Sequence, residues 1–215
     1  MRPVGLVRRV FRRSLAQVDA YAAAWREHNA ASLAADGPLW VVLGDSAAQG
    51  VGASSHLSGY VGVVLQRLRE RDGVPWRVVN LSRSGARTRE VVDVQWPGAR
   101  ELPAQLVTAV VGGNDALHTQ EPLWRRDAAD LCAALPPGAV VATVARGVFE
   151  RKTARVNAVL RAEAAAHGLR VADLWSHTGP PYRGLYFDGF HPNDAGYLQW
   201  VEALWEALEA PAPAG

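Results

Sequence analysis

Five short apolar runs recur along the chain, and patterns of helical spacing separate them. The runs lie at residues 39–43 (LWVVL), 76–81 (WRVVNL), 105–111 (QLVTAVV), 139–144 (AVVATV) and 169–174 (LRVADL). They are continuous or nearly so rather than alternating, which is typical of strands covered on both faces in a parallel sheet. The pattern therefore predicts a central parallel sheet of five strands.

Helical patterns fill the intervals between these strands. Apolar residues at helical spacing predict helices over 14–34, 58–71, 87–95, 122–134, 150–167 and 192–209. Ser58 suits the N-cap of the second helix, and Gly73 follows its end. Strands and helices alternate along the whole chain, which indicates an α/β protein built as a three-layer α/β/α sandwich.

Length and composition fit one globular domain. The 215 residues are 49% hydrophobic and 20% charged, which is ordinary for a protein with a substantial core. We expect residues 36–210 to form the domain, residues 1–35 to form a basic segment and a helix before it, and residues 211–215 (PAPAG) to fray. Cys132 is the only cysteine, which excludes an internal disulfide and a cysteine-based zinc site.

Positive charge is concentrated at the N-terminus. Five arginines lie within the first thirteen residues, and the rest of the chain has 18 basic against 21 acidic side chains, a formal charge of −3. We therefore expect no nucleic-acid partner. The arginines interrupt every apolar run of this segment, and no later run reaches the roughly 18 apolar residues of a membrane span. We expect a cytoplasmic protein without stable membrane insertion, whose arginine segment can make weak contact with an anionic membrane surface.

Polar residues gather where the predicted strands end. The carboxyl ends of parallel strands form one edge of the sheet, where α/β proteins bind their ligands. We therefore expect four polar segments to converge there. Asp45 and Ser46 follow the first strand, Gly85 follows the second, Asn114 and Asp115 follow the third, and Asp188 and His191 precede the last helix.

Asp188 and His191 can form a pair that activates a hydroxyl group. Pro192 disfavours helical geometry at His191 and suits the first position of the following helix. A turn there can bring the carboxylate onto one imidazole nitrogen and leave the other nitrogen free to accept a proton. A serine hydroxyl is a poor nucleophile until such a base takes its proton, and Ser46 is the candidate serine.

Other groups at this edge can stabilise an oxyanion. If a helix starts soon after Ser46, its backbone N–H groups point at the reacting carbonyl, and the Gly85 N–H and the Asn114 amide add two donors. Taken singly, each residue has a structural explanation: Asp45 and Ser46 as a helix cap, Asn114 and Asp115 as a turn, Gly85 as a loop glycine. Their placement in order at successive strand ends favours an active site.

The four segments together resemble the sequence blocks of the GDSL or SGNH hydrolase family. They are GDS at 44–46, NLSRSGART at 80–88, GGND at 112–115 and DGFHP at 188–192. The resemblance spans residues 39–209 and implies a flavodoxin-like sandwich, which agrees with the strand pattern. It does not cover the helix predicted over 14–34.

The resemblance also implies a role for each residue. Ser46 is expected to be the nucleophile, His191 the general base and then acid, and Asp188 the carboxylate that orients it. The oxyanion hole is expected to consist of the backbone N–H of Ser46 together with Gly85 and Asn114. Asp45 and Asp115 are expected to pin the loops without taking part in the chemistry.

These residues predict a serine ester hydrolase that acts on a small-molecule ester without a metal or an organic cofactor. Two alternatives stay open: an acyltransferase with the same triad, and a catalytically silent protein that binds lipid or glycan on the same fold. The classical α/β-hydrolase fold is disfavoured because Ala48 stands where its G-x-S-x-G motif requires glycine. A phosphate-binding loop is disfavoured because the only lysine is Lys152.

Overall fold

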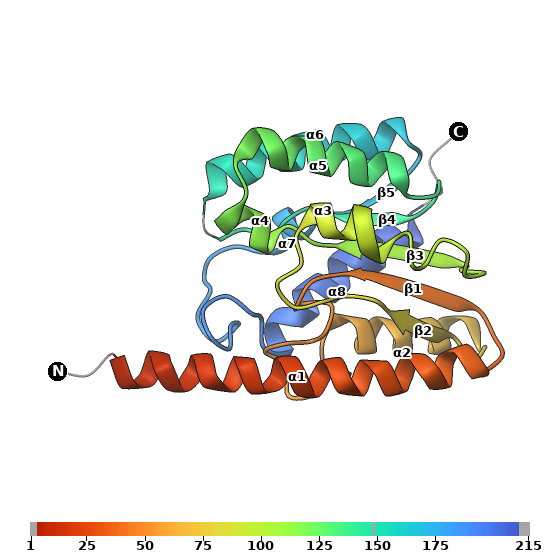
Figure 1. The fold of residues 1–215 in the computed structure, drawn as a ribbon, viewed down its shortest axis with the longest axis horizontal. Helices are drawn as coiled ribbons and strands as arrows, with labels where there is room; N and C mark the ends of the chain where they lie inside the picture. Colours follow the sequence, from red (N-terminus) through yellow and green to blue (C-terminus); the bar gives the residue numbers. More distant parts are fainter. Residues whose placement is uncertain (1–3, 148, 211–215) are drawn as a thin grey trace.

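A five-stranded parallel sheet forms the centre of the computed structural model, which describes residues 4–147 and 149–210 and gives residues 4–13 by their backbone alone (Figure 1). The expected frayed end, 211–215, lies outside the described residues. All five predicted strands are confirmed, four of them shorter than the apolar runs. They are β1 (Leu39–Gly44), β2 (Arg77–Asn80), β3 (Leu106–Val110), β4 (Val140–Ala142) and β5 (Arg170–Ala172), in the order β2-β1-β3-β4-β5.

Helices cover both faces of this sheet. They are α1 (Val4–Ala34), α2 (Tyr60–Asp72), α3 (Thr88–Glu90), the π-helix η1 (Val91–Gln95), α4 (Gly113–His118), α5 (Glu121–Ala134), α6 (Glu150–Ala166), α7 (Leu174–His177) and α8 (Asp194–Glu209). Residues of α5 and α6 pack on one face, and residues of α2 and α8 pack on the other. The strand order is that of flavodoxin-like folds, so the predicted three-layer sandwich is confirmed.

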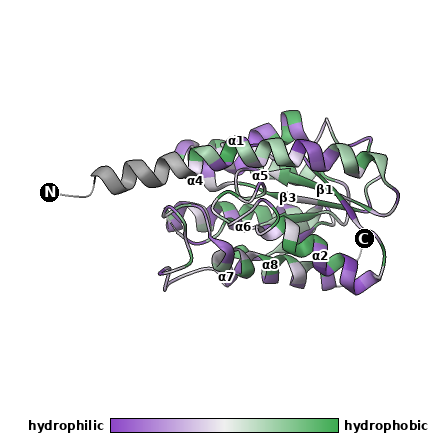
Figure 2. Ribbon diagram, turned by 90° about the horizontal axis from the view of Figure 1, so that it is seen from below, coloured by the Kyte–Doolittle hydropathy of each residue, from purple (hydrophilic) through white to green (hydrophobic). Residues whose placement is uncertain are grey.

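Strand β1 explains why the apolar runs are continuous. Successive side chains of a strand point to opposite faces, and here both faces are buried. Trp40 and Val42 pack with α2 and α8, whereas Val41 and Leu43 pack with α5 and α6. In Figure 2, β1 and β3 are coloured as hydrophobic and lie inside the molecule. Because both faces of a central strand are buried, its sequence is apolar at successive positions and does not alternate between apolar and polar residues.

Helix α1 runs beside the edge strand β2, along the bottom of Figure 1. The Asn29 side chain donates to the backbone oxygen of Asn80 at 2.8 Å and accepts from its backbone N–H at 2.8 Å. Trp25, only 2% exposed, reaches into the core. The helix therefore satisfies part of the edge that a terminal strand leaves open. The membrane contact expected of the arginine segment stays a prediction, because the side chains of residues 4–13 lie outside the description.

One predicted helix cap is wrong, and one predicted helix is present but partly of another type. Helix α2 begins at Tyr60, and its N-cap is Gly59, not Ser58. The Ser58 hydroxyl contacts the hydroxyls of Ser54 and Ser55 instead of capping the helix. The helix predicted over 87–95 is α-helical for one turn and then a π-helix. Apolar spacing over so short a segment does not distinguish the two kinds of turn. No helix in the described part of the chain is long and apolar enough to cross a membrane.

Candidate active site

Strand β1 delivers Ser46 to the carboxyl edge of the sheet, where its side chain is 5% exposed. The helix expected after Ser46 is absent from the described structure, and a series of turns takes its place. The Val51 N–H donates to the backbone oxygen of Ser46 at 3.0 Å, five residues back. The Gly50 N–H donates to the backbone oxygen of Ala47 at 3.0 Å, three residues back, so the spacing of the bonds is irregular. Gly50 and Gly52 have φ values of +83° and +99°, which a regular helix does not contain.

A continuous line of contacts joins Ser46, His191 and Asp188. Ser46 Oγ lies 2.9 Å from His191 Nε2, and His191 Nδ1 lies 2.7 Å from Asp188 Oδ2. The backbone N–H of His191 donates to the other carboxylate oxygen at 2.7 Å. Because an ionised carboxylate only accepts, Nδ1 carries the proton, and Nε2 is free to accept from the serine hydroxyl.

The carboxylate of Asp188 is held in its charged form. Burial acts to raise its pKa, but hydrogen bonds from His191 and Ser14, with the nearby imidazole, outweigh burial and hold the pKa well below its ordinary value. The ionised group can therefore balance the positive charge that His191 acquires when it takes a proton.

The turn that carries His191 is anchored differently from the prediction. Helix α8 begins at Asp194, and the Asn193 side chain caps it by accepting from the Gly196 N–H at 3.0 Å. Pro192 therefore precedes the helix instead of occupying its first position, and it forms an isolated antiparallel bridge with Tyr186. Because Asn193 takes the cap role, His191 and Pro192 lie before the helix, and the imidazole contacts Ser46 in the loop after β1.

Gly52 allows the loop after β1, which contains Ser46, to approach His191. A Cβ atom at this position would lie 2.2 Å from the backbone oxygen of Pro192 and 2.9 Å from His191 Cβ. With φ at +99°, the backbone also favours glycine. No site role for Gly52 was predicted from the sequence, because one glycine among several in a loop does not indicate that its backbone packs against a distant residue.

Three N–H donors at this edge are available to a ligand. Among the described residues, the backbone N–H groups of Ser46 and Gly85 have no acceptor. Gly85 has φ of +83° and open space where a Cβ would stand. The Asn114 side-chain amide donates one of its two N–H groups to the backbone oxygen of Ala86 at 3.0 Å. This bond holds the amide against Ala86, the residue that follows Gly85. Such a set of donors can stabilise an oxyanion.

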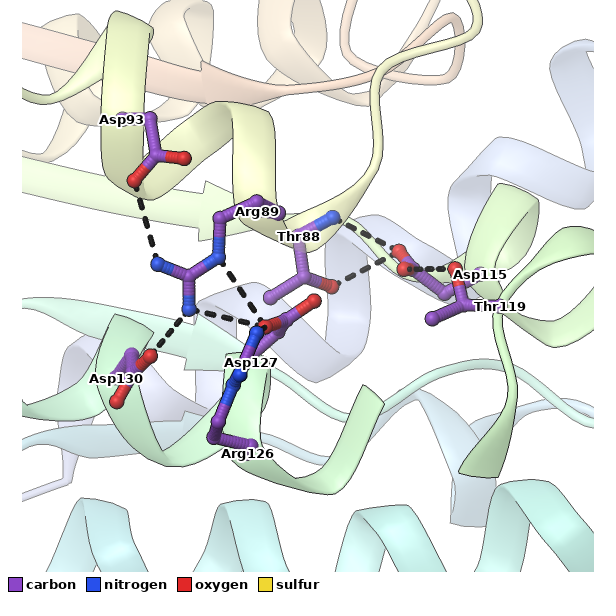
Figure 3. A network of polar contacts seen from close by, with 8 residues as sticks. All are labelled: Thr88, Arg89, Asp93, Asp115, Thr119, Arg126, Asp127 and Asp130. Carbon is purple, nitrogen blue, oxygen red and sulfur yellow. Dashed lines mark hydrogen bonds and ion pairs between the residues drawn. The ribbon is translucent and has the colours of Figure 1, made fainter. Parts of the chain in front are cut away.

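Asp115, in helix α4, binds the start of α3, which follows the loop that contains Gly85 (Figure 3). It accepts from the backbone N–H of Thr88 at 2.8 Å and from its hydroxyl at 2.9 Å, and its other oxygen accepts from the Thr119 hydroxyl at 2.8 Å. Next to Thr88, Arg89 donates to Asp127 of α5 at 2.9 Å, which ties the same segment to the outer layer. Both contacts fix α3, which directly follows the Gly85 loop.

Asp45 stabilises its own turn. One carboxylate oxygen accepts from the Ala47 N–H at 3.0 Å, and the residue is only 6% exposed. Burial raises the pKa of Asp45 to about 6, although the Ala47 bond and the neighbouring His191 act to lower it.

Two buried glutamines that the sequence analysis missed hold the same loops. Gln49 donates to the Ser82 oxygen at 3.1 Å and accepts from the Ser84 N–H at 3.2 Å, which joins the loop after β1 to the loop after β2. Gln95 of η1 accepts from the Gly44 N–H at 2.8 Å and donates to the Gly44 oxygen at 2.9 Å. A glutamine within an apolar segment is the only signal that could have found them.

A pocket of about 400 Å³ opens beside the triad. Ser46 and His191 lie in its wall, and most of the remaining wall is apolar. Its apolar side chains include Val110, Val111, Ala116, Val144, Leu174 and Trp200, with the aromatic residues Tyr182, Tyr186 and Phe190. The pocket can therefore hold an apolar group next to the serine hydroxyl. No group of three or more His, Cys, Asp or Glu side chains suited to a metal ion occurs within residues 4–147 and 149–210.

Comparisons with known proteins identify the fold and the family. Solved structures of similar fold include an acetylxylan esterase from Geobacillus stearothermophilus, Axe2 (18% identity, TM-score 0.68, 82% of this chain and 96% of that chain covered). They also include TesA (22%, 0.65, 80% and 98%) and LAE5, an alpha/beta hydrolase enzyme from the metagenome of Lake Arreo, Spain (21%, 0.67, 80% and 95%). The search of curated proteins found no match. The sequence model of one family matches residues 42–198, which is more than half of the chain, and the protein therefore belongs to the GDSL-like Lipase/Acylhydrolase family.

Proposed function

We propose that the protein is a serine ester hydrolase that cleaves carboxylic esters through an acyl-enzyme on Ser46. One observation carries the proposal: a hydroxyl, an imidazole and a carboxylate are in contact at 2.9 and 2.7 Å, and the first two line an apolar pocket. The first contact activates the nucleophile, and the second fixes the tautomer that makes the activation possible.

The proposed reaction has two steps. His191 takes the proton of Ser46 as the serine oxygen attacks the ester carbonyl, and the charge on the carbonyl oxygen is held by the N–H groups of Ser46, Gly85 and Asn114. His191 then gives the proton to the leaving alcohol, which completes the acyl-enzyme. A water molecule then attacks the acyl carbonyl as His191 takes one of its protons. The bond between the acyl carbon and the Ser46 oxygen breaks, His191 returns the proton to that oxygen, and the carboxylic acid is released.

The pocket supports a small-molecule ester with an apolar part as the substrate. Its walls are mainly aliphatic and aromatic, so an acyl chain or an apolar alcohol gains free energy on entering it. The proposed reaction requires no metal ion and no organic cofactor, because proton transfer, nucleophilic attack and charge stabilisation all come from residues of the chain.

The test is ester turnover by the parent protein and by two serine variants. We expect p-nitrophenyl esters from acetyl to dodecanoyl to be hydrolysed by the parent, and Ser46→Ala to lose roughly 10⁴-fold or more of kcat. Ser32→Ala is the matched control, because Ser32 is buried in α1, 6% exposed, at the far end of that helix from Ser14.

Each alternative predicts a different result in this assay. Absence of turnover in the parent would favour a catalytically silent protein that binds lipid or glycan. Turnover that survives Ser46→Ala would reject Ser46 as the nucleophile. Transfer of the acyl group to an added alcohol in preference to water would identify an acyltransferase. The cytoplasmic location expected from the sequence stays a separate prediction, which cell fractionation tests.

A further inference from the structure

Helix α1 directs a row of polar side chains at the active-site loops. The family model matches residues 42–198, so α1 (Val4–Ala34) lies entirely outside it. The side chains recur every three or four residues, which places them on one face of the helix. They are Ser14, Gln17, Tyr21, Trp25 and Asn29.

The middle of this row holds the segment that packs against His191. Gln17 accepts from the backbone N–H of Gly52 at 2.9 Å, and its amide donates to the Ala53 oxygen at 3.0 Å. Tyr21 donates to the same oxygen at 2.9 Å. Since Gly52 is the residue whose close approach to His191 Cβ and the Pro192 backbone leaves no room for a Cβ of its own, α1 fixes the backbone that packs against the His191 turn.

The row continues to the loops after β1 and β2. The Trp25 indole N–H donates to the backbone oxygen of Gln49 at 3.1 Å. The Asn29 side chain binds the backbone N–H and the backbone oxygen of Asn80. Gln49 in turn binds the loop that carries Gly85 through Ser82 and Ser84. One helix face therefore contacts, directly or through one residue, the loop after β1 and the loop after β2.

Ser14, at the N-terminal end of the row, contacts the triad itself. Its hydroxyl donates to Asp188 Oδ2 at 2.7 Å, and this oxygen also accepts from His191 Nδ1 at 2.7 Å. Ser14 is 7% exposed, so the contact is shielded from water. A hydrogen bond to a charged group in such a place is stronger than a bond between neutral groups.

We propose that the polar row of α1 from Ser14 to Asn29 supports the active-site loops and that Ser14 is a positioning residue for Asp188, which extends the triad to Ser14–Asp188–His191–Ser46. The inference rests on the proposed function, and it adds to it a residue 32 positions before the nucleophile and outside the family blocks. Ser14 touches no reacting atom. It acts by holding the carboxylate in the plane and at the distance that His191 requires.

The four donors around the carboxylate explain why the loss of one matters. Oδ1 accepts from the backbone N–H groups of Phe190 at 3.0 Å and His191 at 2.7 Å, which orient the group from its own turn. Oδ2 accepts from the His191 imidazole and from Ser14, and Ser14 is the donor that comes from a different element of the fold, helix α1. Without it, Asp188 is held only by the loop to which it belongs.

The test compares Ser14→Ala with Ser14→Thr and with Ser32→Ala. We expect Ser14→Ala to lower kcat roughly tenfold with KM changed less than about twofold, since one bond to a charged group is lost and the pocket is untouched. Ser14→Thr retains the hydroxyl and should recover most of kcat. Ser32→Ala makes the same change in the same helix and should retain the parent kcat. Equal kcat in the parent and Ser14→Ala would overturn the proposal, as would an equal loss in Ser32→Ala.

A second readout does not depend on turnover. The proton that His191 Nδ1 shares with Asp188 gives a low-field ¹H resonance, which is assigned by its loss in His191→Ala. We expect Ser14→Ala to shift or broaden this resonance and Ser32→Ala to leave it unchanged. An unchanged resonance in Ser14→Ala would overturn the positioning role even if the protein hydrolyses esters. A shifted resonance in a protein without ester turnover would retain the role of Ser14 and reject the proposed function.

Discussion

Replacement of Asp45 by asparagine should raise the free energy of unfolding above that of the parent, and this gain should be larger at neutral pH than at acid pH. Burial raises the pKa of Asp45 from 3.8 to about 6. At pH values well below 3.8 the carboxyl is neutral in both the folded and the unfolded protein, so burial carries no charge penalty. As the pH rises through 6, the unfolded protein has already released the proton and the folded protein must bury a charge, so stability falls.

The size of this effect follows from the two pKa values. A difference of about two corresponds to roughly 3 kcal/mol of unfolding free energy, reached above about pH 7. Asparagine is nearly isosteric and its oxygen can still accept from the Ala47 N–H, so the variant keeps the turn and loses the charge. The unfolding free energy of Asp45→Asn minus that of the parent should therefore rise from about 0.5 kcal/mol at pH 4 to roughly 3 kcal/mol at pH 8.

Urea denaturation at a series of pH values measures this difference. Asp36→Asn is the matched control, because Asp36 is exposed in the turn before β1, and its stability should follow that of the parent at every pH. A difference between Asp45→Asn and the parent that stays constant from pH 4 to pH 8 would refute the reasoning. It would mean that the folded protein accommodates the charge of Asp45 as well as water does.

Two further substitutions test the oxyanion site and the loop contact. Asn114→Ala removes one proposed oxyanion donor and should lower kcat by about 10²–10³-fold with folding retained, as measured by ester turnover and circular dichroism; a kcat within threefold of the parent would remove Asn114 from the site. Gly52→Ala places a methyl group 2.2 Å from the Pro192 oxygen and against His191, and should lower both the melting temperature and kcat. Gly73→Ala, at φ of +65° with nothing within 4 Å, carries backbone strain alone and should retain kcat; equal losses of kcat in the two glycine variants would argue against the contact.

Most of the sheet was predictable because hydrophobicity decides it. The three inner strands β1, β3 and β4 are buried at every position, and burial on both faces leaves a signal along the whole run, as Val41 and Val42 on opposite faces of β1 show. Helix starts were less predictable, because they depend on single polar contacts. Ser58 could cap α2 but bonds to other serines, and Pro192 could begin α8 but Asn193 caps it.

Part of the candidate site was predictable for a different reason. Ser46, Asp188 and His191 lie in short segments whose chemistry is recognisable without knowledge of the fold, and the structure brings them into contact. Ser14 was not predictable. It is one serine in a helix rich in alanine, 174 positions from Asp188, and only the packing of α1 against the sheet edge brings the two together. Residues that support a site through packing leave no pattern in one sequence.

The measurement that tests the central claim most directly is covalent labelling of Ser46 by a fluorophosphonate, followed by mass spectrometry of the digested protein. An active serine forms a phosphonyl ester, whereas a serine without a base at 2.9 Å does not react at a comparable rate. We predict one adduct, located on Ser46, that is absent from Ser46→Ala and strongly slowed in His191→Ala. Absence of the adduct from the parent protein, or an adduct on another residue, would contradict the assignment of Ser46 as an activated nucleophile.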